Sequence, residues 1–419
     1  MLCCNNLRNI ACAAAFALCL NAGASVKPGV EVLRDGGFSC LVGKRVGLVT
    51  NPSGVDRELR STVDIFHSAP EVNLVALFAP EHGIRGDVWA GDKVDSGKDA
   101  KTGLPVHSLY GATRMPTQEM LSGIDVMVYD IQDVGCRSYT FISTLGLVMR
   151  ACSLKGIPVV VLDRPNPLGG LKVEGPYPEP GFFSFVGQYR IPYIYGLTVG
   201  ELAMLINEEG LNCGQKGDEP ALKCELSVIP MEGWTRNMLY KDTGLPWIAP
   251  SPNIPTPEAA MNYPASGICG EFYGYLQIGI GYTLPFSVFA AEWIDADELK
   301  ARLDSYALPG VAWRPVHYRP FSGSCAGRTV HGVQFHYTDY EAACISMLQF
   351  YVIQAVNELY GREPFANAGG RMPMIRKVCG SDTLPSTFAA SLKVSSIAGR
   401  WNRDTKKFRE ISRNYYLYE

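Results

Sequence analysis

The chain has 419 residues, of which 47% are hydrophobic and 19% are charged, so it can bury at least one large core and is predicted to form two soluble, globular domains. Its formal net charge is −3, and no run of lysine or arginine provides the positive surface that nucleic-acid binding requires. Nucleic acid is therefore not expected as a partner.

The first 24 residues are predicted to be a secretory signal peptide. Arg8 is their single charge, residues 10 to 20 are apolar, and Ala22 and Ala24 place small side chains before a cut at Ser25. The apolar run is too short to span a membrane, so a retained anchor is the less favoured alternative and no membrane span is expected after cleavage. The protein is expected to be exported, either to the periplasm or outside the cell.

Nine of the 13 cysteines lie beyond this segment, and an odd number leaves at least one thiol free. Cys213 and Cys224 flank a polar stretch that a disulfide could close in an oxidising compartment. No spacing of cysteine or histidine is typical of a zinc site, and neither a metal nor a cofactor is expected.

The part from residue 25 to 265 is predicted to be an α/β domain. Apolar runs of strand length at 45–50, 73–79, 124–130 and 157–163 alternate with helical patterns near 58–68, near 116–122 and over 139–155. Such strands, apolar throughout and separated by helices, indicate a parallel sheet that is covered on both faces. Thr198 and Glu201 have the spacing of a capping box at the start of a helix that ends at Glu209, and a strand at 226–231 follows.

Residues 266 to 419 are predicted to form a second, smaller α+β domain. Glycine and aromatic residues are frequent from 266 to 286, and a strand is expected from Phe289 to Ile294. Asp295 and Glu298 could together cap the next helix. Strands are expected at 311–318 and 330–337, before a long helix from Glu341 to Tyr360.

Each of the four predicted parallel strands is followed by polar residues, which begin at Asn51, Pro80, Asp130 and Asp163. Ligands of open α/β sheets bind beyond the carboxyl ends of the strands. One polar strand end would be an ordinary turn. Four of them together predict a functional site at that rim of the sheet.

The composition of this rim favours glycoside hydrolysis. Neither a glycine-rich phosphate loop nor a nucleophile elbow of the type G-x-S-x-G occurs. The rim does offer carboxylates, and pairs of carboxyl groups hydrolyse glycosidic bonds. These candidates are Glu81, Asp130, Asp133 and Asp163.

Glu81 is the preferred general acid, because it follows a buried strand beside Pro80, where burial would favour the neutral form. A solvated loop glutamate is an equally weighted alternative. His82 could orient Glu81, although a role in the turn is slightly preferred. Asp130 is the first choice for the second carboxylate, as base or as orienter of a substrate acetamido group. Residues 83–111 are predicted to be a mobile flap.

Six ordered motifs resemble the exo-β-N-acetylmuramidase family: VGLVTNPSGVD, LFAPEHGIRGD, YDIQDVGCRSYTFISTLG, LDRPNPLGG, PWIAPSPNIPT and RNYYLYE. The resemblance covers nearly the whole chain from about residue 40. It implies a Rossmann-like larger domain, a smaller C-terminal domain, and an exported hydrolase that releases terminal β-linked N-acetylmuramic acid from peptidoglycan fragments. It also implies that Glu81 is catalytic.

N-acetylmuramic acid carries a lactyl carboxylate, which Arg137 or Arg164 could bind in a bidentate fork, with ordinary ion pairing as the alternative for both. Asn166 and Asn253 could bond the sugar or only shape turns, and Tyr139 and Tyr273 could stack on a sugar ring or belong to the core. The remaining candidates for substrate binding are Asn51, Asp163 and Glu271.

The chain departs from the resembled family in one segment. Where members have a polar stretch like EGTNLSEGRGTTRPF, Glu271 is followed by FYGYLQIGIGYTLPF, and Tyr195 stands in place of an expected histidine. This departure favours a second hypothesis, a carbohydrate-binding protein that has lost activity. The third hypothesis is a metal-dependent hydrolase that uses His82, Asp130 and Asp163.

Overall fold

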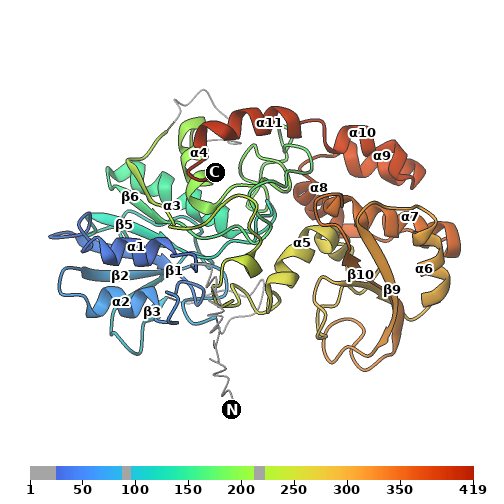
Figure 1. Cartoon of the computed structure of the whole chain (residues 1–419), viewed down its shortest axis with the longest axis horizontal. Coiled ribbons are helices and arrows are strands. Elements are labelled where there is room, and N and C mark those ends of the chain that lie inside the picture. Colours follow the sequence, from blue (N-terminus) through green and yellow to red (C-terminus); the bar gives the residue numbers. More distant parts are fainter. Residues whose placement is uncertain (1–24, 87–95, 212–221) are drawn as a thin grey trace, which may run out of the picture.

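The computed structural model describes residues 25–86, 96–211 and 222–419, and the expected signal peptide lies outside these ranges. The described chain forms a larger domain around a seven-stranded sheet and a smaller domain around a three-stranded sheet (Figure 1). None of the described helices is both long enough and apolar enough to cross a membrane.

The larger domain is the expected α/β domain with a mostly parallel sheet. Its strand order is β3-β4-β2-β1-β5-β6-β7, and only β3 is antiparallel to its neighbour. The central strands are apolar throughout because both of their faces are covered. The strands are β1 (Arg45–Thr50), β2 (Asn73–Ala79), β3 (Gly97–Lys98), β4 (Pro105–Ser108), β5 (Val126–Asp130), β6 (Val159–Leu162) and β7 (Leu226–Ile229).

Two pairs of helices cover the two faces of this sheet. Helices α1 (Gly29–Asp35) and α2 (Thr62–Ser68) pack on one face, and α3 (Phe141–Lys155) and α4 (Val199–Glu209) pack on the other. The predicted capping box of α4 is confirmed, because Thr198 and Glu201 exchange side-chain and backbone hydrogen bonds. A short 3-10 helix, η1 (Tyr240–Asp242), follows β7.

The prediction of a helix near 116–122 is wrong, because residues 118–123 form turns. Pro116 and Gly123 bound this segment, and Gly123 adopts a left-handed backbone conformation with φ +78°. The few residues between them are too short a stretch to repay the cost of helix nucleation.

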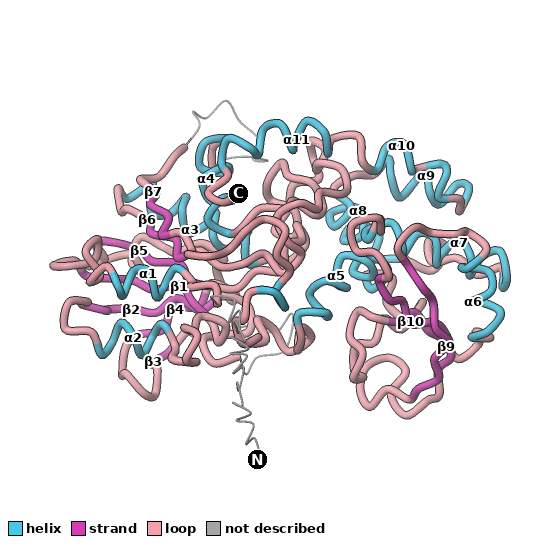
Figure 2. Tube along the Cα trace, in the orientation of Figure 1, coloured by secondary structure: helices cyan, strands magenta, loops and turns pink. Residues whose placement is uncertain are grey.

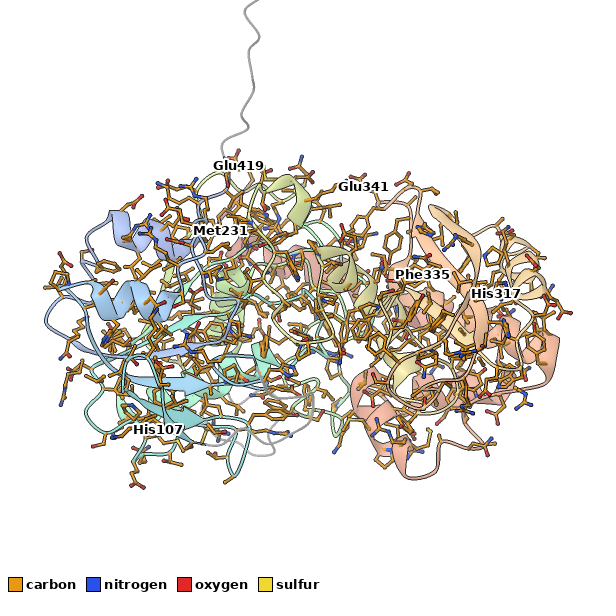
Figure 3. The ribbon with its side chains drawn as sticks, turned by 90° about the horizontal axis from the view of Figure 1, so that it is seen from below. His107, Met231, His317, Phe335, Glu341 and Glu419 are labelled. Carbon is orange, nitrogen blue, oxygen red and sulfur yellow. The ribbon has the colours of Figure 1, made fainter. Side chains whose placement is uncertain are left out.

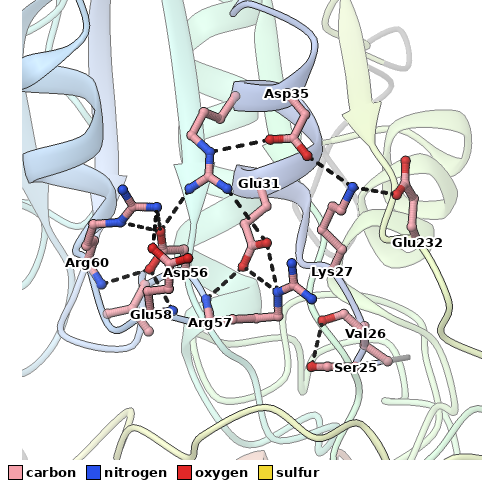
Figure 4. Close-up of polar contacts among 12 residues, drawn as sticks. Ser25, Val26, Lys27, Glu31, Asp35, Asp56, Arg57, Glu58, Arg60 and Glu232 are labelled. Atoms are coloured by element: carbon pink, nitrogen blue, oxygen red, sulfur yellow. Dashed lines mark hydrogen bonds and ion pairs between the residues drawn. The ribbon is translucent and has the colours of Figure 1, made fainter. Parts of the chain in front are cut away.

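Helix α1 was not predicted, and buried charges tie it to the turn after β1 (Figure 4). The carboxylate of Glu31 accepts hydrogen bonds from the backbone and the guanidinium of Arg57, at 2.7 and 2.9 Å. Asp56 is paired with Arg34 of α1 at 2.9 Å and with Arg60 at 2.7 Å. Both carboxylates are almost fully buried, so these pairs fix residues 56–60, which lie between β1 and α2, against α1.

The smaller domain has the expected α+β pattern (Figure 2). Its antiparallel sheet has the order β8-β10-β9 and consists of β8 (Val288–Ala291), β9 (Val311–Tyr318) and β10 (Val330–Tyr337), the last two at the predicted residues. Asp295 caps α6 (Ala296–Asp304), as expected, by accepting from the backbone N–H groups of Asp297 and Glu298. The long helix starts later than predicted, with η2 (Ile345–Met347) and α7 (Leu348–Tyr360). Asp339 closes a turn onto the N–H groups of Glu341 and Ala342 and so delays the helix.

The two domains are joined at two places in the sequence. Helix α5 (Pro257–Gly270) runs through the expected boundary between residues 265 and 266. The second connection lies after α7, where a series of short helices leads back to the larger domain. These helices are η3 (Gly369–Arg371), α8 (Met372–Cys379), α9 (Thr383–Ser391), η4 (Val394–Ser396), α10 (Ala398–Trp401), α11 (Thr405–Ser412) and η5 (Arg413–Tyr415).

The C-terminus returns to the larger domain. Phe408 of α11 joins the hydrophobic cluster on the α3 and α4 face of the sheet. The backbone N–H of Arg236 donates to a backbone oxygen of Glu419 at 2.9 Å, and the N–H of Met231 donates to the Tyr418 hydroxyl at 2.9 Å. Figure 3 shows Glu419 beside Met231, whereas Phe335 and His317 lie in the smaller domain. The last residues therefore pack on the larger domain although the second domain was expected to extend to residue 419.

Candidate active site

The polar strand ends meet at one rim of the sheet. Strands β2, β1, β5 and β6 are parallel neighbours in that order. Thr50 is in register with Asp130, and Ala79 at the end of β2 is in register with Ser108 at the end of β4. The predicted convergence is confirmed, but the side chains at this rim have different roles.

Asp130 is an interior ion-pair partner and not an open carboxylate. It is fully buried, and the Arg164 guanidinium donates to its two oxygens at 2.5 and 2.9 Å. The Thr62 hydroxyl donates to Oδ2, and Arg164 also donates to the carbonyl of Val55 at 2.9 Å. Both oxygens of Asp130 are engaged, and the Nε and Nη2 groups of the buried Arg164 bond Asp130, so the expectations of a second catalytic carboxylate and of a carboxylate binder are corrected.

Asp163 is likewise fully buried and bonded within the protein. Its oxygens accept from the Thr198 hydroxyl at 2.7 Å, from the N–H of Gly200 at 2.8 Å and from the Tyr418 hydroxyl at 2.5 Å. Burial raises the pKa of this carboxyl to about 6. Asp163 anchors α4 and the C-terminus to β6 and does not face a substrate, contrary to the expectation.

Asp133, two residues beyond β5, is paired with Tyr195, which stands where the resembled family has a histidine. The Tyr195 hydroxyl and the N–H of Gly135 both donate to Oδ2 of Asp133, the latter at 2.8 Å. Oδ1 is buried without a partner among the described residues. Burial raises the pKa of this carboxyl to about 6.

Arg137 joins loops of the larger domain to the end of α8 in the smaller domain. It is 1% exposed, and its guanidinium donates to the carbonyls of Pro176 at 2.6 Å, Ile191 at 3.0 Å, Val378 at 3.1 Å and Cys379 at 3.2 Å. Burial lowers its pKa to about 10. The expectation that Arg137 binds a substrate carboxylate is therefore corrected, because it is buried and both Nη1 and Nη2 already donate to carbonyl groups of the chain.

Two of the three candidate asparagines shape turns. The Asn51 carbonyl oxygen accepts from the backbone and hydroxyl of Ser53, and its amide donates to the carbonyl of Pro250 at 3.1 Å. Asn166 bonds the N–H of Leu168 and the carbonyl of Leu197, both at 2.9 Å. Asn253 is half-buried in the loop before α5.

Glu81 is the rim carboxylate that stays partly exposed. Strand β2 ends at Ala79 because Pro80 has no N–H for the ladder, and Glu81 opens the turn that follows. The Thr140 hydroxyl, just before α3, donates to Oε2 of Glu81 at 2.9 Å. The Tyr110 side chain lies close to the same carboxylate, and burial together with the nearby charge of Glu81 raises the pKa of Tyr110 to about 12.

His82 belongs to the turn and not to an exposed site. It is 4% exposed and has φ +73°, a left-handed conformation that non-glycine residues rarely adopt. Its ring packs edge-on against Phe141, with 6.5 Å between the ring centroids. This strained turn aims the preceding Glu81 toward the start of α3.

Aromatic rings connect Glu81 to the smaller domain. Tyr139 packs on Tyr263 of α5 at 5.7 Å, and Tyr263 packs on Phe286 at 5.0 Å. Burial raises the pKa of Tyr263, and the charges of both Glu271 and Glu81 raise it further. Tyr263 therefore lies within electrostatic reach of both carboxylates.

Tyr273 lines a cavity of about 310 Å³ in the smaller domain, and Glu271 contacts it through Arg371, which also lines it. Glu271 is paired with Arg371 at 2.6 Å, and burial raises its pKa. Tyr273 is 76% exposed at the edge of the cavity, as a stacking residue would be. The other residues that line this cavity include Tyr275, Trp293, Arg362, Glu363 and Asn367.

A separate cavity of about 580 Å³ contains none of the predicted site residues. It is lined by segments 168–174, 236–242 and 339–344 and by parts of the C-terminal helices. Its buried cations are engaged, because Lys172 donates to the carbonyl of Ala343 at 2.8 Å and Arg236 donates to Glu201 at 2.6 Å. The chemistry predicted for the rim does not reach this cavity.

The structure does not support the hypothesis of a metal site, and it describes one of the two cysteines of the possible disulfide. In the described ranges no three histidine, cysteine, aspartate or glutamate side chains gather closely enough to hold a metal ion, and this removes His82, Asp130 and Asp163 as a ligand set. Cys213 lies outside the described residues, while Cys224 is a buried, free thiol whose pKa burial raises to about 12.

Four residues near Glu81 were missed: Tyr110, Arg114, Thr140 and Tyr263. The segment 83–111 was predicted as a flap, but its described part contains β4, which pairs with β2 and brings the residues after it to the same rim. Pro105 at the start of β4 concealed this strand, and the alternation in PVHSLY was the signal that could have found it.

Comparison with known proteins agrees with this architecture. Residues 46–258 match the family model for the N-terminal domain of exo-β-N-acetylmuramidase NamZ. Residues 261–418 match the family model for the C-terminal domain of the same family. The chain is 40% identical over 394 residues to the peptidoglycan β-N-acetylmuramidase NamZ of Bacillus subtilis strain 168, covering 94% of this chain and 91% of that protein.

Two solved structures of DUF1343 family proteins from Bacteroides fragilis NCTC 9343 are also similar. One is 49% identical with a TM-score of 0.88, and the other is 28% identical with a TM-score of 0.73. Each comparison covers 94% of this chain and 99% of the other. The chain therefore belongs to the exo-β-N-acetylmuramidase NamZ family.

Proposed function

We propose that this protein is an exo-acting glycoside hydrolase that releases terminal β-linked N-acetylmuramic acid from peptidoglycan fragments, with Glu81 as the general acid. The activity for which the Bacillus subtilis relative is named supports the substrate class. The observation that carries the role of Glu81 is its position: it is half-buried at the rim, where the Thr140 hydroxyl donates to its carboxyl group and the Tyr110 side chain lies close by. Hydroxyl groups can accept as well as donate, so the Thr140 hydroxyl can orient the carboxyl group in both protonation states.

The second catalytic group is proposed to come from the substrate. Asp130 and Asp163 are fully buried and bonded within the chain. In substrate-assisted glycosidases the 2-acetamido oxygen attacks the anomeric carbon, so no protein nucleophile is needed. In this reaction the C1–O bond breaks as the acetamido oxygen bonds to C1, and the Glu81 proton passes to the leaving oxygen. Water then attacks C1 and gives a proton to the Glu81 carboxylate as the bond from C1 to the acetamido oxygen breaks, with net retention of configuration.

The test uses a chromogenic β-N-acetylmuraminide beside the matching N-acetylglucosaminide. The wild-type protein is expected to release the chromophore from the muraminide, and Glu81→Gln to lose at least about 100-fold in kcat, within the usual range for removing a general acid. Glu410→Gln, an exposed glutamate of α11, is the matched control and should retain full activity. Release from the muraminide that persists in Glu81→Gln would refute the assignment, and NMR of the first-formed anomer tests retention.

A sugar-binding protein without activity is the second candidate. The altered segment after Glu271 favours it, since Gln277 and Ile278 are buried and Gln277 bonds Ser324 at 2.9 Å instead of lining a polar wall. Saturable binding of muropeptide fragments by the folded wild-type protein, without release of sugar, would establish this candidate in place of the hydrolase.

Export is also proposed, on the basis of the N-terminal segment. Recovery of the protein from the periplasm or the medium with Ser25 as its first residue would support cleavage of a signal peptide. Recovery of the intact N-terminus in the cytoplasm would refute it.

A further inference from the structure

Arg114 contacts Tyr110, which lies close to Glu81, but Arg114 has no role in the proposed proton transfer. It follows β4, whose carboxyl end lies next to that of β2 at the rim. Its side chain is exposed, in contrast to Arg137 and Arg164, which are 1% and 5% exposed. It is therefore a cation of the rim that solvent and a ligand can reach.

Two aromatic rings hold the Arg114 guanidinium in place. Its central carbon lies 4.1 Å from the ring centroid of Phe185 and 5.4 Å from that of Tyr110. The two rings also contact one another, with 6.1 Å between their centroids. Stacking of this kind engages the face of a guanidinium and leaves its N–H edges free for a planar anion. Among the described residues no carboxylate lies within ion-pair distance of Arg114.

Tyr110 connects this cation to the reacting end of the site. The Arg114 guanidinium lies over its ring, the Glu81 charge is close enough to raise its pKa, and Tyr110 follows the end of β4, next to the end of β2 from which Glu81 extends. Tyr110 therefore lies between the exposed cation and the proposed general acid. On N-acetylmuramic acid, the lactyl carboxylate at O3 and the glycosidic oxygen at C1 belong to the same ring.

We propose that Arg114 binds the carboxylate of the terminal sugar and so makes the site specific for an acidic N-acetylhexosamine. This inference rests on the proposed function for the identity of the substrate. Arg114 takes this role in place of Arg137 and Arg164, which are buried and already donate to groups of the chain. Arg114 is a specificity residue that contacts the substrate at a distance from the bond that breaks.

Binding measurements in the Glu81→Gln background test the inference independently of turnover. N-acetylmuramic acid and N-acetylglucosamine are titrated into this protein and into versions that also carry Arg114→Ala or Arg114→Lys, using calorimetry. Arg114→Ala is expected to weaken binding of the acidic sugar by about 10- to 100-fold, the range for one charge-assisted hydrogen-bonded pair, and to leave the neutral sugar unchanged. Arg114→Lys should fall between, because it keeps the charge but loses the planar fork.

The matched control is Arg190→Ala. Arg190 is also exposed and stacked on a tyrosine, at 5.2 Å from the Tyr177 centroid, but that ring packs against Phe408 of α11 and not beside Glu81. It should not alter the binding of either sugar. In the Glu81 wild-type background, Arg114→Ala should raise KM for the muraminide more than it lowers kcat.

Equal weakening for both sugars, or no weakening for the acidic one, would overturn the inference. Increasing salt should lower the affinity of the acidic sugar for the protein with Arg114 and not for Arg114→Ala. If the acidic sugar binds through Arg114 while the wild-type protein releases no chromophore, the proposed hydrolysis fails and this inference stands.

Discussion

Replacing Asp130 by asparagine separates a structural from a catalytic role for this carboxylate. Asp130 is 0% exposed and carries the charge that neutralises Arg164, so the substitution leaves a guanidinium that is 5% exposed without its counter-ion. Breaking a buried ion pair by removing one partner costs about 3 to 5 kcal/mol. For a domain of this size 1 kcal/mol corresponds to about 2 to 4 °C, so the midpoint of thermal unfolding should fall by roughly 10 °C.

The assay combines differential scanning calorimetry with muraminide turnover at a temperature at which the variant is still folded. Asp130→Asn should lose stability, and its folded fraction should keep most of the wild-type kcat. The double variant Asp130→Asn/Arg164→Met should be less destabilised than the sum of the single variants, because it removes the unpaired charge. A variant as stable as the wild type but without turnover would refute the structural role and restore Asp130 as a catalytic group.

Two further predictions concern other buried polar residues. Burial raises the pKa of the Asp133 carboxyl from its ordinary value of 3.8 to about 6. Its contribution to the free energy of unfolding is therefore fully present below about pH 4 and is lost as the pH rises through 6. The loss amounts to about 3 kcal/mol. Asp133→Asn should therefore gain stability relative to the wild type between pH 4 and pH 7 in urea unfolding, and a difference that does not change with pH would contradict this reasoning. Arg137→Met should leave four carbonyl groups of two domains without their donor, lower the unfolding temperature by several degrees and speed proteolysis between the domains. The control is Arg376→Met. Arg376 forms a solvent-exposed ion pair on α8, the helix whose carbonyl groups Arg137 binds, so its substitution should change neither property.

The local pattern of the sequence determined most of the secondary structure. Apolar runs located β1, β2, β5 and β6, and capping residues such as Thr198 and Asp295 located the starts of helices. These features depend on neighbours within a few residues, so they can be read from the chain alone. The order of polar segments after parallel strands also predicted the rim, and Pro80 placed Glu81 at its edge.

Only the tertiary structure decided which polar residues at this rim are open to a ligand. Asp130 is occupied by Arg164, 34 positions away, and Arg137 by carbonyls of α8, more than 200 positions away. Arg114 reached the rim through β4, a strand that its leading proline concealed. Burial and pairing are properties of contacts between distant parts of the chain, whereas local periodicity reports only which face of an element is apolar. The sequence by itself therefore determined the fold class, the family and the position of Glu81, and the packing of distant segments assigned the other residues to structure or to the site.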